Sequence, residues 1–527
     1  MKTVADPPAA MATCPTFPPL PRRLFQLTVG FLFLVTISFH LVAAKMGWRI
    51  YRDQHLGTAL EYAKGRIDLL NPRVVGFNAN QAPTPQEVPL WQATAAVLFK
   101  VFGHWFGWAN VASLLFAGAG LWPLFQMAKA SAGERAAWWT LIFFVTQPLV
   151  FYYAGRGGTD GSCLTLTLWF VYFADLLVRT GQARWWLPAA FFGALSATTK
   201  MPFFFCAGLL CLFRLPLHDG KSVRRWLLLA GAGLFAGAAF WAWTRHCNTI
   251  IARAEFPFVD LRINAGEDGG KFMRYWYFGD LAYRLNAANW LKGGWRFLAG
   301  EFGSFVLSGL LLWGLLGLRQ RLGQLWMLAG AMTTLVFTHL VLHHSQYYLM
   351  VSPAVAMLCG VAVEKLECTL AITGPWAQRV AVPAAAGLLL LATIQGLIAM
   401  KVALDLDPYP GRIAALIRQH TSPADKLLIR GGGWGGHLLF LSEREGLSIW
   451  STEFLEKPEN LARIRQLGFT KLVAVSESPL LTAVQQTNPG QASQRRETYH
   501  NSLTRLVSPW PILLQTEDLL IKEIPAP

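Results

Sequence analysis

The sequence predicts a polytopic α-helical membrane protein with a small extracytoplasmic α/β domain at its C-terminus. Of its 527 residues, 54% are hydrophobic and 14% are charged, whereas an ordinary soluble domain carries about a quarter charged residues. Apolar stretches of the length that crosses a bilayer as a helix, about 20 residues, recur from residue 24 to residue 400. Beyond residue 402 these stretches stop, and short apolar runs alternate with a helical pattern.

The N-terminal region predicts the orientation of the chain. Residues 1–23 form a Pro-rich tail, and Arg22 and Arg23 precede the first apolar stretch, 24–44. Because positive charge marks the cytoplasmic end of a span, the tail is expected in the cytoplasm. The stretch is too long for a signal-peptide core, so we expect a retained helix. Residues 45–106 then form a first outer loop, in which 89–103 (PLWQATAAVLFKVFG) is expected to be an interfacial helix.

The later spans follow from apolar runs that alternate with clusters of Lys and Arg. They are expected at 107–128, 136–153, 162–178, 226–244, 302–318, 323–341, 347–363 and 380–400, with a second outer loop at 245–300. Residues 186–213 allow either one long helix or two short helices that turn at Lys200. One helix leaves Lys200 in mid-bilayer, at a cost of about 2.5–3.5 kcal/mol. It also places the cluster of positive residues after residue 220 outside the cytoplasm, against the positive-inside rule. Two short helices are therefore predicted, which gives about eleven spans within a transmembrane domain at 24–401.

The last part of the chain, 402–527, is predicted to be a soluble extracytoplasmic α/β domain. KLLIRGG, LSIW and KLVAVSES have the pattern of short buried strands, and PENLARIRQLG that of a helix ending at a glycine. The run GGGWGG lacks the Lys-Ser/Thr of a phosphate-binding loop and the spacing of a dinucleotide fingerprint. A turn after a strand is the simpler interpretation of that run.

Charge and cysteine usage exclude several classes of function. A formal net charge of +16 would suggest nucleic acid in a soluble protein. Here Lys and Arg lie mainly between apolar runs, which favours topology signals and contact with membrane lipids and excludes a nucleic-acid partner. The seven cysteines contain no CxxC pair, and no metal-ligand spacing stands out. No cofactor or metal site is therefore predicted, although a divalent ion stays open.

The predicted topology brings polar residues from five separate segments to one outer membrane face. They are Asp53, Glu87, Asp160, Lys200, His343 and His344. A polar cavity that opens outward at the level of the bilayer is the simplest explanation.

Each of these residues also has a purely structural interpretation. Asp53 is either a base that accepts a proton from a hydroxyl nucleophile, or a loop acid paired with Arg52. Asp160, four residues after Arg156 in YAGRGGTDGS, either takes part in the site or caps the following helix. Arg156 is positioned to bind an anion or to pair with Asp160.

The remaining candidates are open in the same way. Lys200 is either a ligand for a phosphate or an interfacial residue whose charged end reaches water. His343, His344 and Tyr347 either contact a substrate or belong to an aromatic belt at the interface.

This pattern resembles the membrane glycosyltransferases of the GT-C fold, in the bacterial branch with the lipid A aminoarabinose transferase and the protein O-mannosyltransferases. The resemblance covers about residues 24–365. YRDQHLGTALEYAKGR and PQEVPLWQATAAVLFKVFG match the family's first outer loop, in which Asp53 matches the first residue of an acidic pair. Gln54 replaces the second acid, Glu87 and Pro89 match, and Val88 stands where a Lys is usual.

Three later motifs follow in the family's order. Arg156 and Asp160 come after the third span, Lys200 lies in TTKMP between two short helices, and HHSQYYLMVSP supplies the polar-Tyr-Tyr segment before a Pro-containing span.

The resemblance implies an inverting glycosyltransferase of the bacterial inner (plasma) membrane. Such an enzyme moves a sugar from a polyprenyl-phosphate donor to a lipid, glycan or protein acceptor outside the cytoplasm. It implies that Asp53 is the catalytic base and that Asp160 assists in catalysis. It also implies that Glu87, Arg156, Lys200, His343, His344 and Tyr347 contact the substrates.

Two other functions stay open at the level of the sequence. A transporter or flippase for a lipid-linked glycan would be expected to show internal repeats and helices broken in mid-membrane, and no clear repeat is present. A non-catalytic scaffold for lipid-linked glycans is kept open by the altered acidic pair.

Overall fold

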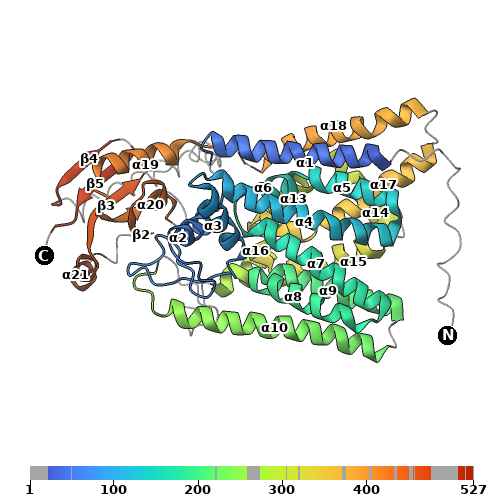
Figure 1. The fold of residues 1–527 in the computed structure, drawn as a ribbon, viewed down its shortest axis with the longest axis horizontal. Helices are drawn as coiled ribbons and strands as arrows, with labels where there is room; N and C mark the ends of the chain where they lie inside the picture. Colours follow the sequence, from blue (N-terminus) through green and yellow to red (C-terminus); the bar gives the residue numbers. More distant parts are fainter. Residues whose placement is uncertain are drawn as a thin grey trace.

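The computed structural model describes residues 22–525 apart from 49, 220–221, 258–272, 304, 318–320, 371–374, 401, 403–405, 432–435, 450–454, 456, 476–508 and 517. The predicted tail 1–23 therefore lies almost wholly outside the described residues. Helices run along the long axis of the molecule, and a small sheet lies at one end of the helical bundle (Figure 1).

The first half of the chain is helical. Its elements are α1 (Arg22–Lys45), α2 (Asp53–Lys64), α3 (Leu90–Phe102), α4 (Gly107–Ala132), α5 (Glu134–Thr146), α6 (Pro148–Gly155), α7 (Thr159–Thr180), the short 3₁₀ helix η1 (Ala183–Trp185), α8 (Trp186–Thr199) and α9 (Met201–Asp219). The expected interfacial helix 89–103 is present as α3, and the expected span 136–153 is divided between α5 and α6, which bend by 68°. Pro148 causes this break because its ring cannot continue the helical hydrogen-bond pattern.

The second half of the bundle follows the same plan. Its elements are α10 (Val223–Ile251), α12 (Leu281–Leu285), α13 (Ala287–Phe302), α14 (Phe305–Gly317), α15 (Arg321–Val336), α16 (Thr338–His343), the 3₁₀ helix η2 (Ser345–Met350), α17 (Ser352–Leu370) and α18 (Pro375–Ala399).

Helix length and composition identify fewer spans than the sequence predicts. Within the described residues, five helices are long and apolar enough to cross a membrane, and seven if each bent pair counts as one span. The predicted number of about eleven also counts shorter helices such as α8 and α15, which are 14 and 16 residues long. That number stays a prediction.

The turn at Lys200 is confirmed. Lys200 lies 3.3 Å from Asp160 in the first turn of α7, whereas Arg214 of α9 lies 2.8 Å from Asp175 near the other end of α7. The helix α9 therefore runs beside α7 in the same direction. The helices α8 and α9 form a hairpin. Such a turn places Lys200 at a helix end, as the two-helix prediction requires.

The segment expected as an outer loop, 245–300, contains more helix than predicted. The helix α10 continues to Ile251, and α12 and α13 occupy much of the described remainder. Asn286 caps α13 by accepting a hydrogen bond from the amide of Ala288. Packing also holds α13, because Gly293 lies against Leu342 and Tyr348. These contacts join distant segments, so the local sequence pattern does not reveal them.

The C-terminal domain is a five-stranded mixed sheet in the order β2-β1-β3-β5-β4. Its strands are β1 (Lys426–Arg430), β2 (Glu445–Ile449), β3 (Phe469–Val475), β4 (Ile512–Gln515) and β5 (Leu519–Glu523), and its helices are α19 (Tyr409–His420), α20 (His437–Leu441) and α21 (Pro458–Gln466). The strand β1 pairs in parallel with β2 and β3, and β5 is antiparallel to β3 and β4.

The predicted α/β character of this domain is confirmed. The three predicted strands are β1, β2 and β3, and the predicted helix is α21, after which Gly468 takes a left-handed conformation. The sheet is covered on both faces because alternate residues of β1 point to opposite sides. Leu427 packs with Ile413 of α19, and Leu428 packs with Ile464 of α21. Of the GGGWGG run, residues 432–435 lie outside the described residues.

Candidate active site

The segment that carries Asp53 is held against the loop before α7. The amide of Arg52 donates to the carbonyl of Gly157 at 2.7 Å, and the amide of Gly157 donates to the carbonyl of Ile50 at 3.1 Å. Asp53 is the first residue of α2 and is 4% exposed. A carboxylate in the first turn of a helix is stabilised by the helix dipole.

The glycines of GRGGTDG allow this close approach. A Cβ atom on Gly157 would meet the side chains of Ala109 and Tyr51 at 3.0 and 3.1 Å. A Cβ atom on Gly161 would lie 2.7 Å from the carbonyl of Tyr153, closer than a Cβ atom can lie without movement of the backbone. These glycines therefore permit close backbone packing.

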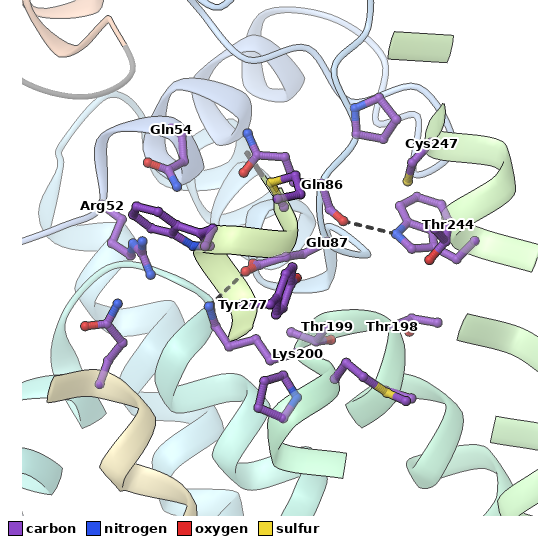
Figure 2. A pocket seen from close by; sticks show the side chains of 18 of the residues that line it. Arg52, Gln54, Gln86, Glu87, Thr198, Thr199, Lys200, Thr244, Cys247 and Tyr277 are labelled. Atoms are coloured by element: carbon purple, nitrogen blue, oxygen red, sulfur yellow. Dashed lines mark hydrogen bonds and ion pairs between the residues drawn. The ribbon is translucent and has the colours of Figure 1, made fainter. Parts of the chain in front are cut away.

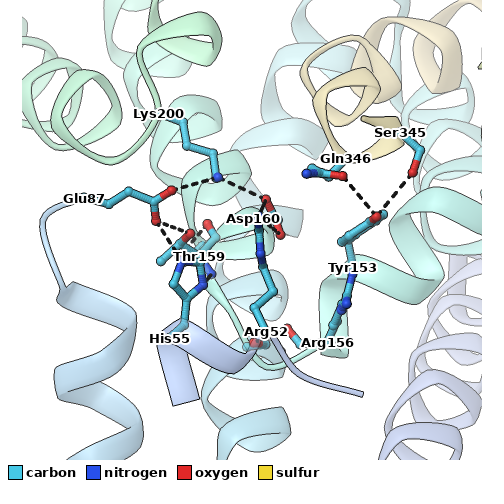
Figure 3. Close-up of polar contacts among 12 residues, drawn as sticks. Arg52, His55, Glu87, Tyr153, Arg156, Thr159, Asp160, Lys200, Ser345 and Gln346 are labelled. Carbon is cyan, nitrogen blue, oxygen red and sulfur yellow. Dashed lines mark hydrogen bonds and ion pairs between the residues drawn. The ribbon is translucent and has the colours of Figure 1, made fainter. Parts of the chain in front are cut away.

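Lys200 joins two carboxylates that come from different segments of the chain (Figure 3). Its Nζ lies 2.9 Å from Glu87 Oε1 and 3.3 Å from Asp160 Oδ1. Arg52 lies on the other side of Asp160, with Nη1 3.3 Å from both carboxylate oxygens. Lys200 is 5% exposed, so its charge is compensated by ion pairs.

Glu87 is held by two further residues. The hydroxyl of Thr159 donates to Glu87 Oε2, and His55 Nε2 lies 3.3 Å from the same oxygen. Burial raises the pKa of Glu87, but Lys200, His55 and Arg52 outweigh it, and the pKa falls below its ordinary value. Glu87 is therefore ionised at neutral pH.

His55 is neutral at this position. Its Nδ1 accepts the amide of Thr159 at 3.2 Å, which leaves the proton on Nε2, facing Glu87. Burial lowers the pKa of His55 to about 4, although the charge of Glu87 opposes the shift. His55 therefore acts as a hydrogen-bond bridge between the start of α7 and Glu87.

These groups border a cavity of about 370 Å³. Asp53, Glu87, Arg156 and Lys200 line one part of it, and Figure 2 shows the ion pair between Glu87 and Lys200. The other part is lined by Phe240, Trp243, Thr244, Cys247 and Asn248 of α10, together with Trp276, Tyr277, His344, Gln346 and Tyr347. The volume suits a small ligand, and the lining combines charged groups with aromatic and neutral polar side chains.

The structure brings together most of the residues predicted from the sequence. Glu87, Asp160 and Lys200 are in direct contact, and Asp53 and Arg156 line the same cavity. Tyr347 also lines it, with its ring 5.4 Å from Lys200 Nζ.

The geometry excludes three of the structural alternatives for these residues. Arg52 pairs with Asp160 and not with Asp53. Arg156 lies over the rings of Tyr152 and Tyr153, at 5.3 and 5.7 Å, while Asp160 forms ion pairs with Arg52 and Lys200. Asp160 is not the cap of α7, because the capping position is Gly158.

Of the two neighbouring histidines, only one lines the cavity. His344 lines the cavity, whereas the ring of His343 stacks on His339 with a centroid distance of 5.1 Å and does not belong to the described lining. The carbonyl of His343 accepts a hydrogen bond from Arg296 at 2.6 Å. His343 therefore supports the helix end rather than the cavity.

Sequence reasoning missed several residues of the site. Arg52 and His55 flank Asp53 in the motif YRDQH, and this proximity of charged and polar residues was the available signal. The aromatic wall of α10 carried no signal, because Trp residues are frequent throughout the chain. Within the described residues, no group of three or more His, Cys, Asp or Glu side chains is arranged to hold a metal ion.

Comparisons with known proteins agree with this geometry. The model of the dolichyl-phosphate-mannose-protein mannosyltransferase family matches residues 84–243, the segment with Glu87, Arg156, Asp160 and Lys200. A search of curated protein sequences gave no significant match.

Solved structures resemble nearly the whole chain. ArnT from Cupriavidus metallidurans in the apo state has a TM-score of 0.58 at 14% identity, with 94% of this chain and 98% of that chain covered. Its structure bound to undecaprenyl phosphate gives 0.56 with the same identity and coverage. Arabinofuranosyltransferase AftD from Mycobacteria gives 0.50 at 14% identity over 86% of this chain and 35% of that chain. The chain therefore has the GT-C fold of membrane glycosyltransferases, as its sequence motifs predicted.

Proposed function

We propose that the chain is an inverting glycosyltransferase that moves a sugar from a polyprenyl-phosphate donor to a hydroxyl acceptor at the extracytoplasmic face of the inner (plasma) membrane. The observation that carries the proposal is that a buried carboxylate, Asp53, lines the same cavity as Arg52, Arg156 and Lys200. A base and a phosphate-binding group are the two functions that this transfer requires. ArnT, which has the same fold, has been solved bound to undecaprenyl phosphate.

The cations of the cavity offer donors to an anionic leaving group. Arg52 and Lys200 are paired with the carboxylates of Asp160 and Glu87, Arg156 lines the same cavity, and His55 is neutral. With Asp53 counted as an ionised base, three positive charges balance three negative ones, so the cavity binds a phosphate through these donors and not through a surplus of charge. A phosphate entering there gains charge-assisted hydrogen bonds. Because Val88 stands where related sequences have a Lys, these three cations carry the task.

The reaction follows from this arrangement. The acceptor hydroxyl oxygen attacks the anomeric carbon of the donor sugar, and its proton passes to the Asp53 carboxylate. The bond between the anomeric carbon and the phosphate oxygen breaks on the opposite side, and polyprenyl phosphate leaves with the electron pair. Attack from the side opposite to the leaving group inverts the anomeric configuration. Asp160 holds Arg52 and Lys200 in place, and His344 and Tyr347 line the donor side.

The first test identifies the donor. We expect a mass spectrum of the lipids that co-purify with the chain from bacterial membranes to contain a polyprenyl-phosphate sugar. The same membranes, labelled with radioactive sugar, then report transfer to lipid, glycan or protein fractions.

The second test concerns the base. We expect Asp53→Asn to reduce transfer by about 100-fold or more, since a general base contributes at least that factor. The matched control is Glu61→Gln on the same helix, because Glu61 pairs with Lys64 at the surface. Normal transfer by Asp53→Asn would contradict the assignment of the base, and transport of the lipid without transfer would favour a flippase.

A further inference from the structure

A histidine of the C-terminal domain reaches the residue assigned as the base. His437 Nδ1 lies 3.7 Å from Asp53 Oδ2, and the side chains of both residues are 3% exposed or less. Asp53 lines the cavity, whereas His437 is not part of its described lining. His437 therefore contacts Asp53 without belonging to that lining.

Backbone contacts fix the position of His437. The residue before it, Gly436, has a φ of +67°, and a Cβ atom there would lie 2.5 Å from the carbonyl of Val75. The next residue of the outer loop, Gly76, forms a parallel bridge with Leu447, and its carbonyl accepts the amide of Ser448 at 2.9 Å. The first outer loop thus extends the β2 edge of the sheet, and α20 begins directly beside it.

Side-chain packing continues this contact toward the membrane domain. Phe440, one turn after His437 on α20, lies 6.1 Å from the ring of Tyr51 and 6.3 Å from that of Phe106. Tyr51 precedes the Arg52–Asp53 pair. The same helix α20 therefore contacts the segment of Asp53 through both a polar and an aromatic residue.

We propose that His437 is a positioning residue for Asp53, so that the C-terminal domain completes the active site. This inference rests on the proposed function, because Asp53 is the base of that reaction. An imidazole held 3.7 Å from one carboxylate oxygen restricts the orientation of the carboxylate and leaves the second oxygen for the proton of the acceptor. A base held in one orientation loses less rate to misaligned conformers.

A purely structural role makes a different prediction. If His437 only filled space at the domain contact, then a side chain of similar size would replace it and the titration of Asp53 would not depend on a hydrogen-bond donor. The variants His437→Ala and His437→Gln separate the two roles, because Gln retains a donor and Ala does not. His420→Ala is the matched control, since His420 lies on the same domain and is exposed.

The test uses labelling of Asp53 by dicyclohexylcarbodiimide, which reacts with protonated carboxyls, quantified by peptide mass spectrometry between pH 4 and 9. In His437→Ala we expect the labelling midpoint to rise by about one pH unit, because the polar contact that favours the ionised form is lost. His437→Gln and His420→Ala are expected to keep the parent midpoint. The other titratable groups around the cavity wall are unchanged in all variants; these are Arg52, His55, Glu87, Arg156, Asp160 and Lys200.

Transfer kinetics provide a second measurement. His437→Ala is expected to lower kcat about tenfold with little change in KM. This loss is part of the factor of about 100 or more that a general base contributes. His437→Gln is expected to recover most of the lost kcat. An unchanged labelling midpoint in His437→Ala, or an equal rise in the Ala and Gln variants, would overturn the proposal. Labelling requires no sugar, so a chain that transfers no sugar but shows the shift would contradict only the proposed function.

Discussion

Lys200 illustrates how single residues hold the site together. It is buried, yet it carries a charge that bridges Glu87 and Asp160. Removing a charge from water is costly, and the compensation comes only from well-placed partners. Because the two carboxylates come from segments on either side of α4, the lysine also joins the first outer loop to α7.

This arrangement predicts a strong effect of Lys200→Met on stability. The variant leaves two buried carboxylates without their shared cation, which is expected to cost about 3–5 kcal/mol. The thermal unfolding midpoint of the detergent-purified protein should fall accordingly. Lys64→Met is the control, because Lys64 is 66% exposed and lies 3.6 Å from Glu61, so its loss should cost less than about 1 kcal/mol.

The double variant Lys200→Met/Glu87→Gln sharpens this prediction. Removal of one uncompensated carboxylate should recover part of the lost stability, because residues that share an ion pair are not additive. Equal losses for Lys200→Met and Lys64→Met, or no recovery in the double variant, would show that the bridge contributes little.

For single residues, the sequence predicts which residues belong to the site better than it predicts which of them pair with each other. The expected alternation of inward and outward spans brings Glu87, Asp160 and Lys200 to one membrane face, and the structure places these three residues in contact. One alternative for Arg156 was a pair with Asp160, four residues away, but Arg52 takes that place. Sequence distance is a poor guide here, because the bridge between Tyr51 and Gly157 aligns two segments that only the folded chain brings together.

The hairpin of α8 and α9 is the element on which the topology depends. Since Lys200 lies at its turn, the helices on both sides change direction. At the other end of the bundle, Arg22 of α1 lies 3.4 Å from Glu134 of α5. These two helices therefore begin at the same end of the bundle.

A reporter that is active only outside the cytoplasm tests this topology. Fused after residue 401, it should be active, and fused at Gly133 between α4 and α5 it should be silent. Silence after residue 401 would mean that the predicted number of spans is wrong by one and that the hairpin does not cross as proposed.

The contact of α20 with the first outer loop gives a second prediction at this scale. Gly436→Ala places a Cβ atom against the carbonyl of Val75 and forces a left-handed conformation on a residue with a side chain, at a cost of about 1–2 kcal/mol or more. We expect a lower unfolding midpoint and faster proteolysis of the C-terminal domain.

Gly411→Ala is the matched control for this variant. Gly411 lies in α19 with open space around its Cβ position, and alanine favours a helix by about 1 kcal/mol over glycine. The control should therefore be as stable as the parent or more stable. If Gly436→Ala matched this control, the close contact between loop and domain would not contribute to the fold.

For the whole molecule, the sequence predicts the parts but not the interface between them. The membrane helices and β1, β2 and β3 follow from apolar length and alternation. The strands β4 and β5 were missed because their apolar residues are interrupted by a short polar turn. The contact of His437 with Asp53 joins two domains, and hydrophobic periodicity describes which face of an element is buried, not which distant surface covers it.

The pH dependence of stability is a property of the whole molecule that His55 and Glu87 determine. The pKa of His55 falls on folding from 6.5 to about 4 because of burial. Between pH 6.5 and 4, the unfolded chain therefore binds a proton at His55 that the folded chain does not bind. Stability is lost as the pH falls through this range. This shift corresponds to roughly 3 kcal/mol. Glu87 acts in the same direction, because its pKa is lowered on folding and the stability it provides is lost on acidification.

We therefore expect the unfolding midpoint, followed by tryptophan fluorescence, to fall steadily between pH 7 and pH 4.5. In His55→Gln the side chain still accepts from Thr159 and donates to Glu87 but has no proton to gain, so the fall should be much shallower above the range in which Glu87 titrates. His420→Gln, which removes an exposed histidine, should follow the parent. A parent-like slope in His55→Gln would show that this bridge does not set the acid sensitivity, and that carboxylates elsewhere in the chain do.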